Sequence, residues 1–132
     1  MSNSFFVLFT RAPWRTSNEF KSNLEKEYTT GLVIEPGSGS GEGIYCLEWS
    51  VEPIETGIWR AALSSDLCTV VFDGTAEASL ALVIWLASQA QHGASPYLFD
   101  SSYSFGFVVD PDMTAKMIEA DCIAERHEPL LQ

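Results

Sequence analysis

The feature that most constrains the fold is an unbroken apolar run past the middle of the chain. Residues 80–87 read Leu-Ala-Leu-Val-Ile-Trp-Leu-Ala. The run lies inside a segment with helix-start signals at Thr75 and Glu77 and a stop signal at Gly93. A helix with almost no polar face must be covered on nearly all sides. We therefore expect residues 76–91 to form a helix at the core of the molecule.

Short segments on either side of this helix have the patterns of strands. Residues 5–9 are a continuous apolar run, which is typical of a central strand covered on both faces. Residues 44–51 alternate in the period-two manner of a half-buried strand. The remaining expected strands are 32–34, 58–63, 67–72, 97–99 and 103–109, with 58–63 and 67–72 forming a hairpin.

Two further helices are expected outside the core segment. Thr16 and Glu19 have the spacing of a capping box, and apolar residues follow at steps of four, which predicts a surface helix over 17–28. Asp110 followed by Pro111 combines an N-cap with proline at the first helical position. This pair predicts a last helix that runs through about Cys122.

The resulting order, β-α-β-β-β-β-α-β-β-α, interleaves hairpins with helices, which is typical of the α+β class. A length of 132 residues suits one domain, and 46% apolar against 19% charged residues is a globular composition. We therefore expect a single α+β domain, residues 1–132. Its mostly antiparallel sheet should pack against the one buried helix, with the other two helices flanking it.

Acidic side chains dominate the charge. Eighteen Asp and Glu against seven Lys and Arg give a formal net charge of -11, and the sequence pI is about 4.3. The excess lies in residues 27–115, which hold twelve acids and a single base, Arg60. Nucleic-acid binding depends on basic groups that neutralise phosphate, and anionic membranes repel acidic surfaces. We therefore expect no direct binding to nucleic acid and no membrane partner.

The cysteines and the N-terminus indicate a cytoplasmic protein. Cys46, Cys68 and Cys122 are odd in number and form no C-x-x-C motif, so a disulfide framework is not expected. The N-terminus lacks the basic region of a signal peptide. The longest apolar run also falls short of the roughly 20 residues that a membrane helix needs.

Two motifs resemble enzyme signatures but lack their essential residues. The glycine-rich segment 36–43 has no P-loop lysine, and Glu42 stands where a dinucleotide-binding loop requires glycine. The segment Asp73-Gly74-Thr75 is similar to part of the strand-end motif of haloacid-dehalogenase-type phosphatases. However, Val71 stands at the nucleophile position, and a strand end, a turn and a helix cap explain the segment without catalysis.

Other candidate groups also have simpler explanations. His92 and His127 are the only histidines, and neither has a metal-ligand spacing with a cysteine. The two carboxylates of Asp110 and Asp112 suit a helix start as well as a metal. We therefore expect no catalytic residue, no metal and no cofactor, and the chain is not expected to be an enzyme.

The strongest binding signal is the segment 48–60, which mixes carboxylates with tryptophans. Trp and Arg are prominent in binding hot spots, and carboxylates around them complement a basic partner. The alternative is that Trp49 and Trp59 belong to the core while the glutamates form a solvated face. The expected partner-binding residues are Glu48, Glu52, Glu55, Trp59 and Arg60.

In size, acidity and lack of catalytic motifs, the chain resembles the immunity proteins that neutralise bacterial toxins. The resemblance implies a small cytoplasmic binding protein that occludes the active site of a basic enzyme, a toxin or a nuclease. A phage-type inhibitor that presents carboxylates in place of nucleic-acid phosphates is a close variant.

Two other classes remain open. A subunit that oligomerises through an exposed strand edge is one. The other is a small-ligand or catalytic domain with an aromatic pocket between sheet and helix. The expected lining of that pocket is Tyr97, Phe99, Tyr103, Phe105 and Phe107.

Overall fold

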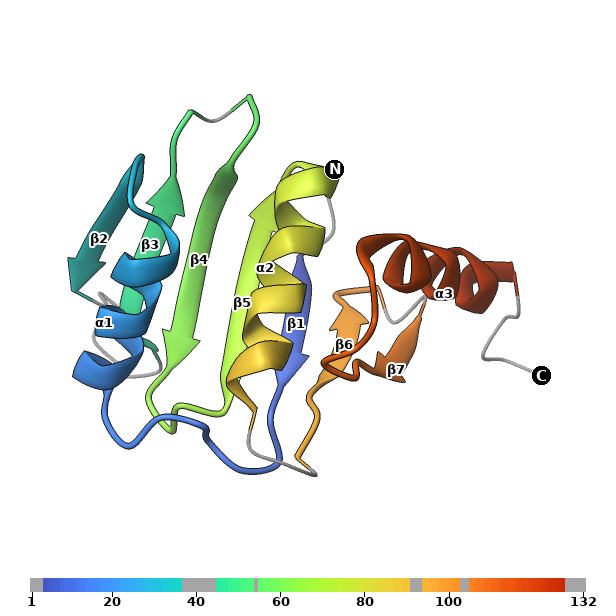
Figure 1. Cartoon of the computed structure of the whole chain (residues 1–132), viewed down its shortest axis with the longest axis horizontal. Coiled ribbons are helices and arrows are strands. Elements are labelled where there is room, and N and C mark those ends of the chain that lie inside the picture. The colour runs from blue at the N-terminus through green and yellow to red at the C-terminus, as the bar shows by residue number, and fades with distance from the viewer. Residues whose placement is uncertain (1–3, 37–44, 54, 91–93, 103–104, 128–132) are drawn as a thin grey trace.

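A computed structural model describes residues 4–36, 45–53, 55–90, 94–102 and 105–127. Within these ranges, seven strands form one antiparallel sheet in the order β2-β3-β4-β5-β1-β6-β7 (Figure 1). This arrangement confirms the α+β class and the mostly antiparallel sheet. In chain order, the elements are β1 (Phe5–Leu8), α1 (Ser17–Glu27), β2 (Leu32–Pro36), β3 (Tyr45–Val51), β4 (Ile58–Ser64), β5 (Thr69–Gly74), α2 (Ala76–Gln89), β6 (Tyr97–Asp100), β7 (Gly106–Val108) and α3 (Ala115–His127).

The helices lie on one side of the sheet. Figure 1 shows α1 in front of β2 and β3, α2 in front of β5 and β1, and α3 beside β6 and β7. Aromatic contacts join the first two helices, since the Phe20 ring of α1 lies 5.9 Å from the Trp85 ring of α2. No described helix covers the opposite side of the sheet, which we call the outer face.

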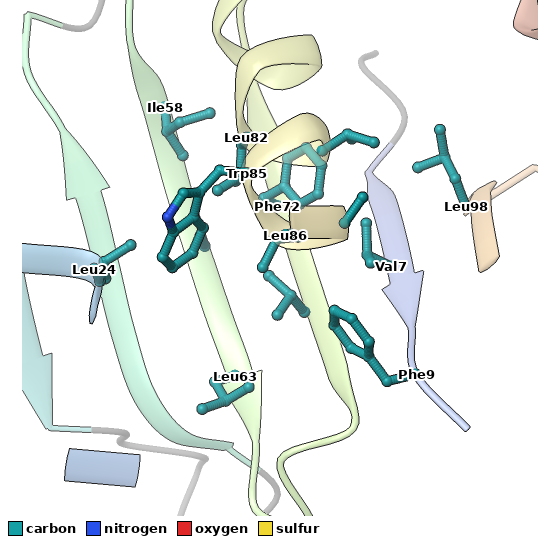
Figure 2. Close-up of a cluster of buried hydrophobic side chains, with 14 of the residues drawn as sticks. Val7, Phe9, Leu24, Ile58, Leu63, Phe72, Leu82, Trp85, Leu86 and Leu98 are labelled. Carbon is teal, nitrogen blue, oxygen red and sulfur yellow. The ribbon is translucent and has the colours of Figure 1, made fainter. Parts of the chain in front are cut away.

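The apolar helix α2 forms the centre of the core, as its sequence predicts. Leu82, Trp85 and Leu86 are buried and point toward the strands in Figure 2. Thr75 is the N-cap, and its side-chain oxygen accepts a hydrogen bond from the Ala78 amide at 3.2 Å. The helix ends at Gln89, two residues earlier than expected. The expected stop signal, Gly93, lies outside the described residues.

The surface helix α1 begins with a modified capping box. Thr16 Oγ1 accepts from the Glu19 amide at 3.1 Å, as expected. The Glu19 carboxylate, however, accepts from the amide of Arg15 at 2.8 Å rather than from that of Thr16. Phe20 and Leu24 are fully buried and attach this helix to the sheet.

The last helix begins later than the sequence predicts. Pro111 lies in a turn in which the Asp110 carbonyl accepts from the Met113 amide at 3.0 Å, and proline is favourable at the second position of such a turn. The helix starts at Ala115 and continues past Cys122 to His127. Thr114 acts as its cap by accepting from the Met117 amide at 3.3 Å. The prediction of a helix start at Asp110 is therefore wrong.

The expectation that the first strand is covered on both faces is also wrong. β1 is an interior strand between β5 and β6, as predicted. Val7 faces the helices and is fully buried, whereas Leu8 is 40% exposed on the outer face. Phe6, on the same outer face, is shielded partly by the Phe99 ring, which stacks on it at 5.0 Å.

Candidate functional site: the outer face of the sheet

Side chains of the outer face form rows that can be followed across the strands. The register pairs each residue of the central row with its neighbour on the next strand. This row changes in character from acidic on β2 and β3, through small side chains on β4 and β5, to aromatic on β1 and β6. The central row is Glu35, Glu48, Ala62, Val71, Phe6, Phe99 and Gly106.

Exposed apolar side chains are concentrated on this face. Six large hydrophobic residues of the described chain are exposed, and only Met117, on α3, lies elsewhere. Monomeric proteins rarely leave apolar side chains grouped in water unless the patch binds something. The five on the outer face are Leu8, Val33, Trp59, Tyr97 and Val108, at 39–53% exposure. They form two groups: Val33 and Trp59 line one depression over β2 to β4, whereas Leu8, Tyr97 and Val108 are cross-strand neighbours on β1, β6 and β7.

A β-bulge at the start of β4 places two of the expected binding residues on the outer face. Ile58 is paired with Gly74, whereas Arg60 is paired with Asp73, so β4 contains one extra residue at this point. Trp59 and Arg60 are therefore both exposed between the buried side chains of Ile58 and Ala61. Strict alternation would have turned one of the two toward the helices.

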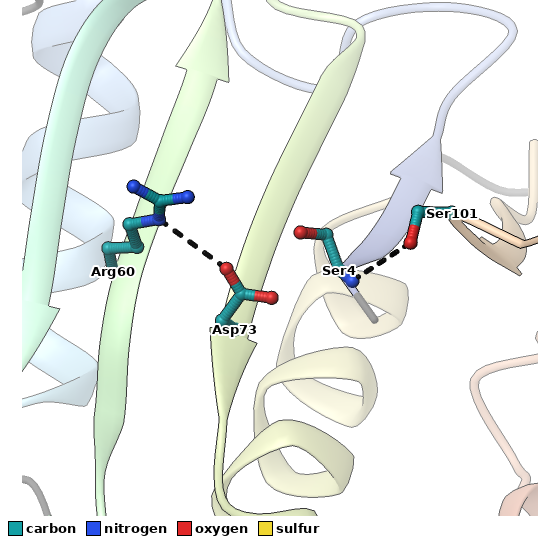
Figure 3. Close-up of polar contacts among 4 residues, drawn as sticks. All are labelled: Ser4, Arg60, Asp73 and Ser101. Atoms are coloured by element: carbon teal, nitrogen blue, oxygen red, sulfur yellow. Dashed lines mark hydrogen bonds and ion pairs between the residues drawn. The ribbon is translucent and has the colours of Figure 1, made fainter. Parts of the chain in front are cut away.

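The charges of the outer face are mostly negative. Glu35 and Glu48 are directly opposite each other on β2 and β3, an arrangement in which like charges repel. Arg60 Nε lies 3.4 Å from Asp73 Oδ2 (Figure 3). The Arg60 side chain is 84% exposed, so this ion pair adds little to stability.

Hydrogen bonds fix the edge of the face near Asp73. The Ser4 amide donates to Ser101 Oγ at 3.1 Å, which joins the start of β1 to the turn after β6 (Figure 3). Asp73 Oδ1 is buried and has no hydrogen-bond partner among the described residues. Asp73 therefore holds Arg60 through one carboxylate oxygen, Oδ2, alone.

Two depressions open on the outer face. The larger, of about 390 Å³, lies over Ala62 and Val71, because these small side chains stand between the longer Glu48 and Phe6 in the central row. The smaller, of about 160 Å³, is lined by Val33, Glu35, Glu48, Trp59 and Arg60. Both depressions are open to solvent on the outer face, so side chains of a protein partner can enter them.

The structure brings together three of the five expected binding residues. Glu48, Trp59 and Arg60 line the smaller depression. Glu52 and Glu55 are exposed, but they lie in the connection between β3 and β4 and not on the strands. Trp49 is only 3% exposed, and its ring lies 5.2 Å from the Phe20 ring of α1. Trp49 therefore belongs to the core and Trp59 to the surface.

Sequence analysis missed the contributions of β2 and of the β1–β6 pair. Val33 and Glu35 complete the smaller depression, and Phe6 with Phe99 forms the aromatic part of the face. The only available signal for the first pair was the alternation of Val33 and Glu35 with Leu32 and Ile34, which pack against the core.

The expected aromatic pocket does not form from its five residues. Tyr97 and Phe99 belong to the outer face, whereas Phe105 is buried on the helix side and Phe107 packs against the core there. The register separates them: Phe107 lies opposite Leu98, whereas Tyr97 and Phe99 lie opposite Val108 and Gly106, so the two pairs of aromatic residues are on opposite faces. Tyr103, like His92 and most of the glycine-rich segment, lies outside the described residues.

Three comparisons with known proteins add no relationship to this description. No family model, no curated protein and no solved structure matches the chain.

None of the described helices has both the length and the apolar character needed to cross a membrane. Throughout the described ranges, no group of three or more His, Cys, Asp and Glu side chains is placed to hold a metal ion.

Proposed function

We propose that the protein is a cytoplasmic inhibitor that binds a basic partner protein through the outer face of its sheet. It acts by covering the active site of that partner, as the resemblance to immunity proteins implies. The observation that carries the proposal is the group formed by two exposed apolar side chains, Val33 and Trp59, with the carboxylates of Glu35 and Glu48 on a face that no described helix covers.

Trp59 is the expected energetic centre of this interface. Its side chain is 42% exposed and lies beside two carboxylates, Glu35 and Glu48, and the guanidinium of Arg60. Aromatic side chains at the centre of an interface contribute much of the binding energy once surrounding contacts exclude water. The nearby carboxylates favour Lys or Arg on the partner, and such a cation reduces the repulsion between Glu35 and Glu48.

Net charge favours a basic partner over a second copy of the chain. Two copies that meet through their outer faces would each bring a net charge of -11. A basic enzyme would instead be attracted over several ångströms, and such steering accelerates association at low salt. A toxin or nuclease whose active site binds a polyanion fits this requirement. A phage-type inhibitor that competes with nucleic acid would use the same chemistry.

Site-specific photo-crosslinking in the source cell tests the proposal. A photoreactive amino acid replaces Trp59 in one variant and Met117, the exposed apolar residue of α3, in the matched control. We expect the variant at position 59 to capture a basic protein that the variant at position 117 does not. The captured protein is then purified, and its enzymatic activity is measured with and without the inhibitor. An acidic partner, or full activity in the complex, contradicts the proposal.

Two substitutions separate the roles of shape and charge in binding to that purified partner. Trp59→Ala should weaken binding at least about thirtyfold, mainly through faster dissociation. Glu48→Lys should slow association and reduce its dependence on salt. Glu25→Lys is the control, because it makes the same charge change on the exposed side of α1, away from the outer face. Equal effects of Glu48→Lys and Glu25→Lys would show that only total charge matters.

The same measurement decides the role of the loop glutamates. Glu52→Lys and Glu55→Lys alter the connection between β3 and β4 and leave the strands unchanged. If the partner extends over the end of the sheet, each should slow association as Glu48→Lys does. If the contact is confined to the strands, both should behave like Glu25→Lys.

A further inference from the structure

Besides the two depressions of the outer face, a cavity lies on the helix side of the sheet. It has a volume of about 310 Å³. Its walls come from the sheet, from one side of α2 and from α3. The residues that carry the argument are Phe5, Phe105, Ser79, Val83, Glu119 and Cys122.

The cavity follows from the way in which α3 packs. Figure 1 shows the axis of α3 running across that of α2 rather than alongside it. Helices that cross steeply touch over a short length and then diverge. Ile118 is fully buried and fixes the first half of α3, whereas Glu119 and Cys122 border the space that remains.

The inner wall is apolar except for one hydroxyl group. Phe5, Val83 and Phe105 contribute hydrocarbon surface, and most of the lining is apolar. Ser79 is 5% exposed, and its Oγ has no hydrogen-bond partner among the described residues. A buried hydroxyl without a partner is unfavourable, so a polar atom of a bound molecule would stabilise this site.

The outer rim carries a carboxylate. Glu119 is exposed on α3 and also lines the cavity. An apolar space with a few polar groups at defined positions is typical of small-molecule sites. A carboxylate at the rim favours a ligand with a positive charge at the corresponding end.

We propose that this cavity binds a small aromatic amine, with the ring system against Phe5 and Phe105 and the ammonium group toward Glu119. The size indicates a bicyclic ring, because an apolar cavity of about 150 Å³ already accepts benzene and this one is about twice as large. This proposal is independent of protein binding at the outer face, since no residue is shared between the two sites.

Calorimetry with three indole probes tests the proposal. Tryptamine, tryptophol and indole-3-propionate share a ring and carry a cation, a neutral hydroxyl and an anion, respectively. We expect tryptamine to bind at least about ten times more tightly than indole-3-propionate. Glu119→Gln should remove most of that preference and leave tryptophol binding unchanged. Glu25→Gln, which removes the same charge from α1, should leave the preference intact.

Alkylation of the cysteines locates the bound probe. The structure contains no disulfide at Cys46, Cys68 or Cys122, and only Cys122 lines the cavity. Tryptamine should slow alkylation of Cys122, measured by mass spectrometry, while the other two cysteines serve as internal controls. Val83→Phe, which fills the cavity, should abolish this protection.

Two results would overturn the proposal. One is equal binding of tryptamine to the Glu119→Gln and Glu25→Gln variants, which would indicate attraction by total charge alone. The other is binding without protection of Cys122, which would place the probe elsewhere on the molecule. If Val83→Phe fails to fold, the surface variant Glu119→Gln still decides the outcome.

Discussion

Gly31 stands where the chain turns from α1 into β2, and its backbone has a φ of +79°. A Cβ there would collide with the carbonyl oxygen of Glu52, whose amide donates to the Gly31 carbonyl at 2.7 Å. We expect Gly31→Ala to reduce the free energy of unfolding by about 2 kcal/mol or more, because left-handed backbone and collision add together. Urea unfolding measures the loss. The exposed neighbour Thr30→Ala is the control, and equal losses would contradict this account.

Thr75 connects β5 to the core helix α2. Its side chain caps α2 by accepting from the Ala78 amide. Thr75→Ala should cost about 1 kcal/mol of folding free energy, whereas Thr75→Ser should retain most of it, because serine keeps the accepting oxygen. Thermal unfolding of the three proteins checks this order. If Thr75→Ser is as damaging as Thr75→Ala, the threonine methyl group matters more than the cap.

The raised pKa of Tyr28 should make the protein less stable in alkaline solution. Burial, with a smaller contribution from the charge of Glu27, raises the pKa of Tyr28 from 10.0 to about 12. Between these values the folded chain holds a proton that the unfolded chain releases, so the free energy of unfolding falls as pH rises. Tyr28→Phe should reduce this fall, and phenylalanine can keep the ring contact with Trp85. Urea unfolding at pH 9.5 and pH 11 measures it, and identical losses in both proteins would exclude Tyr28 as the cause.

At the level of elements, the regular segments could be predicted, and the irregular ones could not. Leu82 and Leu86 on α2, like Leu47 and Trp49 on β3, follow periods that the sequence displays directly. The bulge that exposes Trp59 beside Arg60 depends on pairing with β5, a contact that no local pattern encodes. The start of α3 was predicted at Asp110, because Asp before Pro suits a turn as well as a helix start; the turn closed by Met113 takes up this pair, and Thr114 caps the helix.

The candidate site was only partly visible in the sequence for a related reason. Glu48, Trp59 and Arg60 lie within one short segment, so composition alone could single them out. Phe6, Glu35 and Phe99 come from strands that are far apart in the chain and share one row of the outer face only through the sheet order and register. Whether such residues belong to the core or to the surface depends on which side of the sheet the helices cover. That side is determined by tertiary packing and is not encoded in any local pattern.

We expect the attachment of the helix α3 to the core to depend mainly on one residue, Ile118. Ile118 is its fully buried anchor in the core, and Met113 and Cys122 only pack partly against the core. Ile118→Ala should leave a cavity and lower the hydrogen-exchange protection of α3 amides, while β5 and α2 keep most of theirs. Met117→Ala, at an exposed position of the same helix, is the control. Equal loss of protection throughout the sheet would show that α3 unfolds only with the rest of the molecule.

At the scale of the whole molecule, the charge and the outer face act against each other. An exposed apolar patch favours self-association, whereas a net charge of -11 keeps copies apart at neutral pH. The acidity therefore has two roles in our proposal, which are attraction of a basic partner and protection of an open sheet face. When acid neutralises the carboxylates, the repulsion between copies is lost, while the exposed apolar side chains that favour association remain.

The effect of acid on association follows from this balance. As pH falls toward the sequence pI of about 4.3, copies should associate through the outer face, and light scattering should rise. Leu8→Lys and Val108→Lys should each suppress that rise, because they place a charge within the exposed group of Leu8, Tyr97 and Val108. Met117→Lys adds the same charge on α3, at an exposed apolar residue away from the outer face, and should suppress it less. Equal suppression by all three variants would mean that net charge alone controls association and that the outer face is not a preferred contact surface.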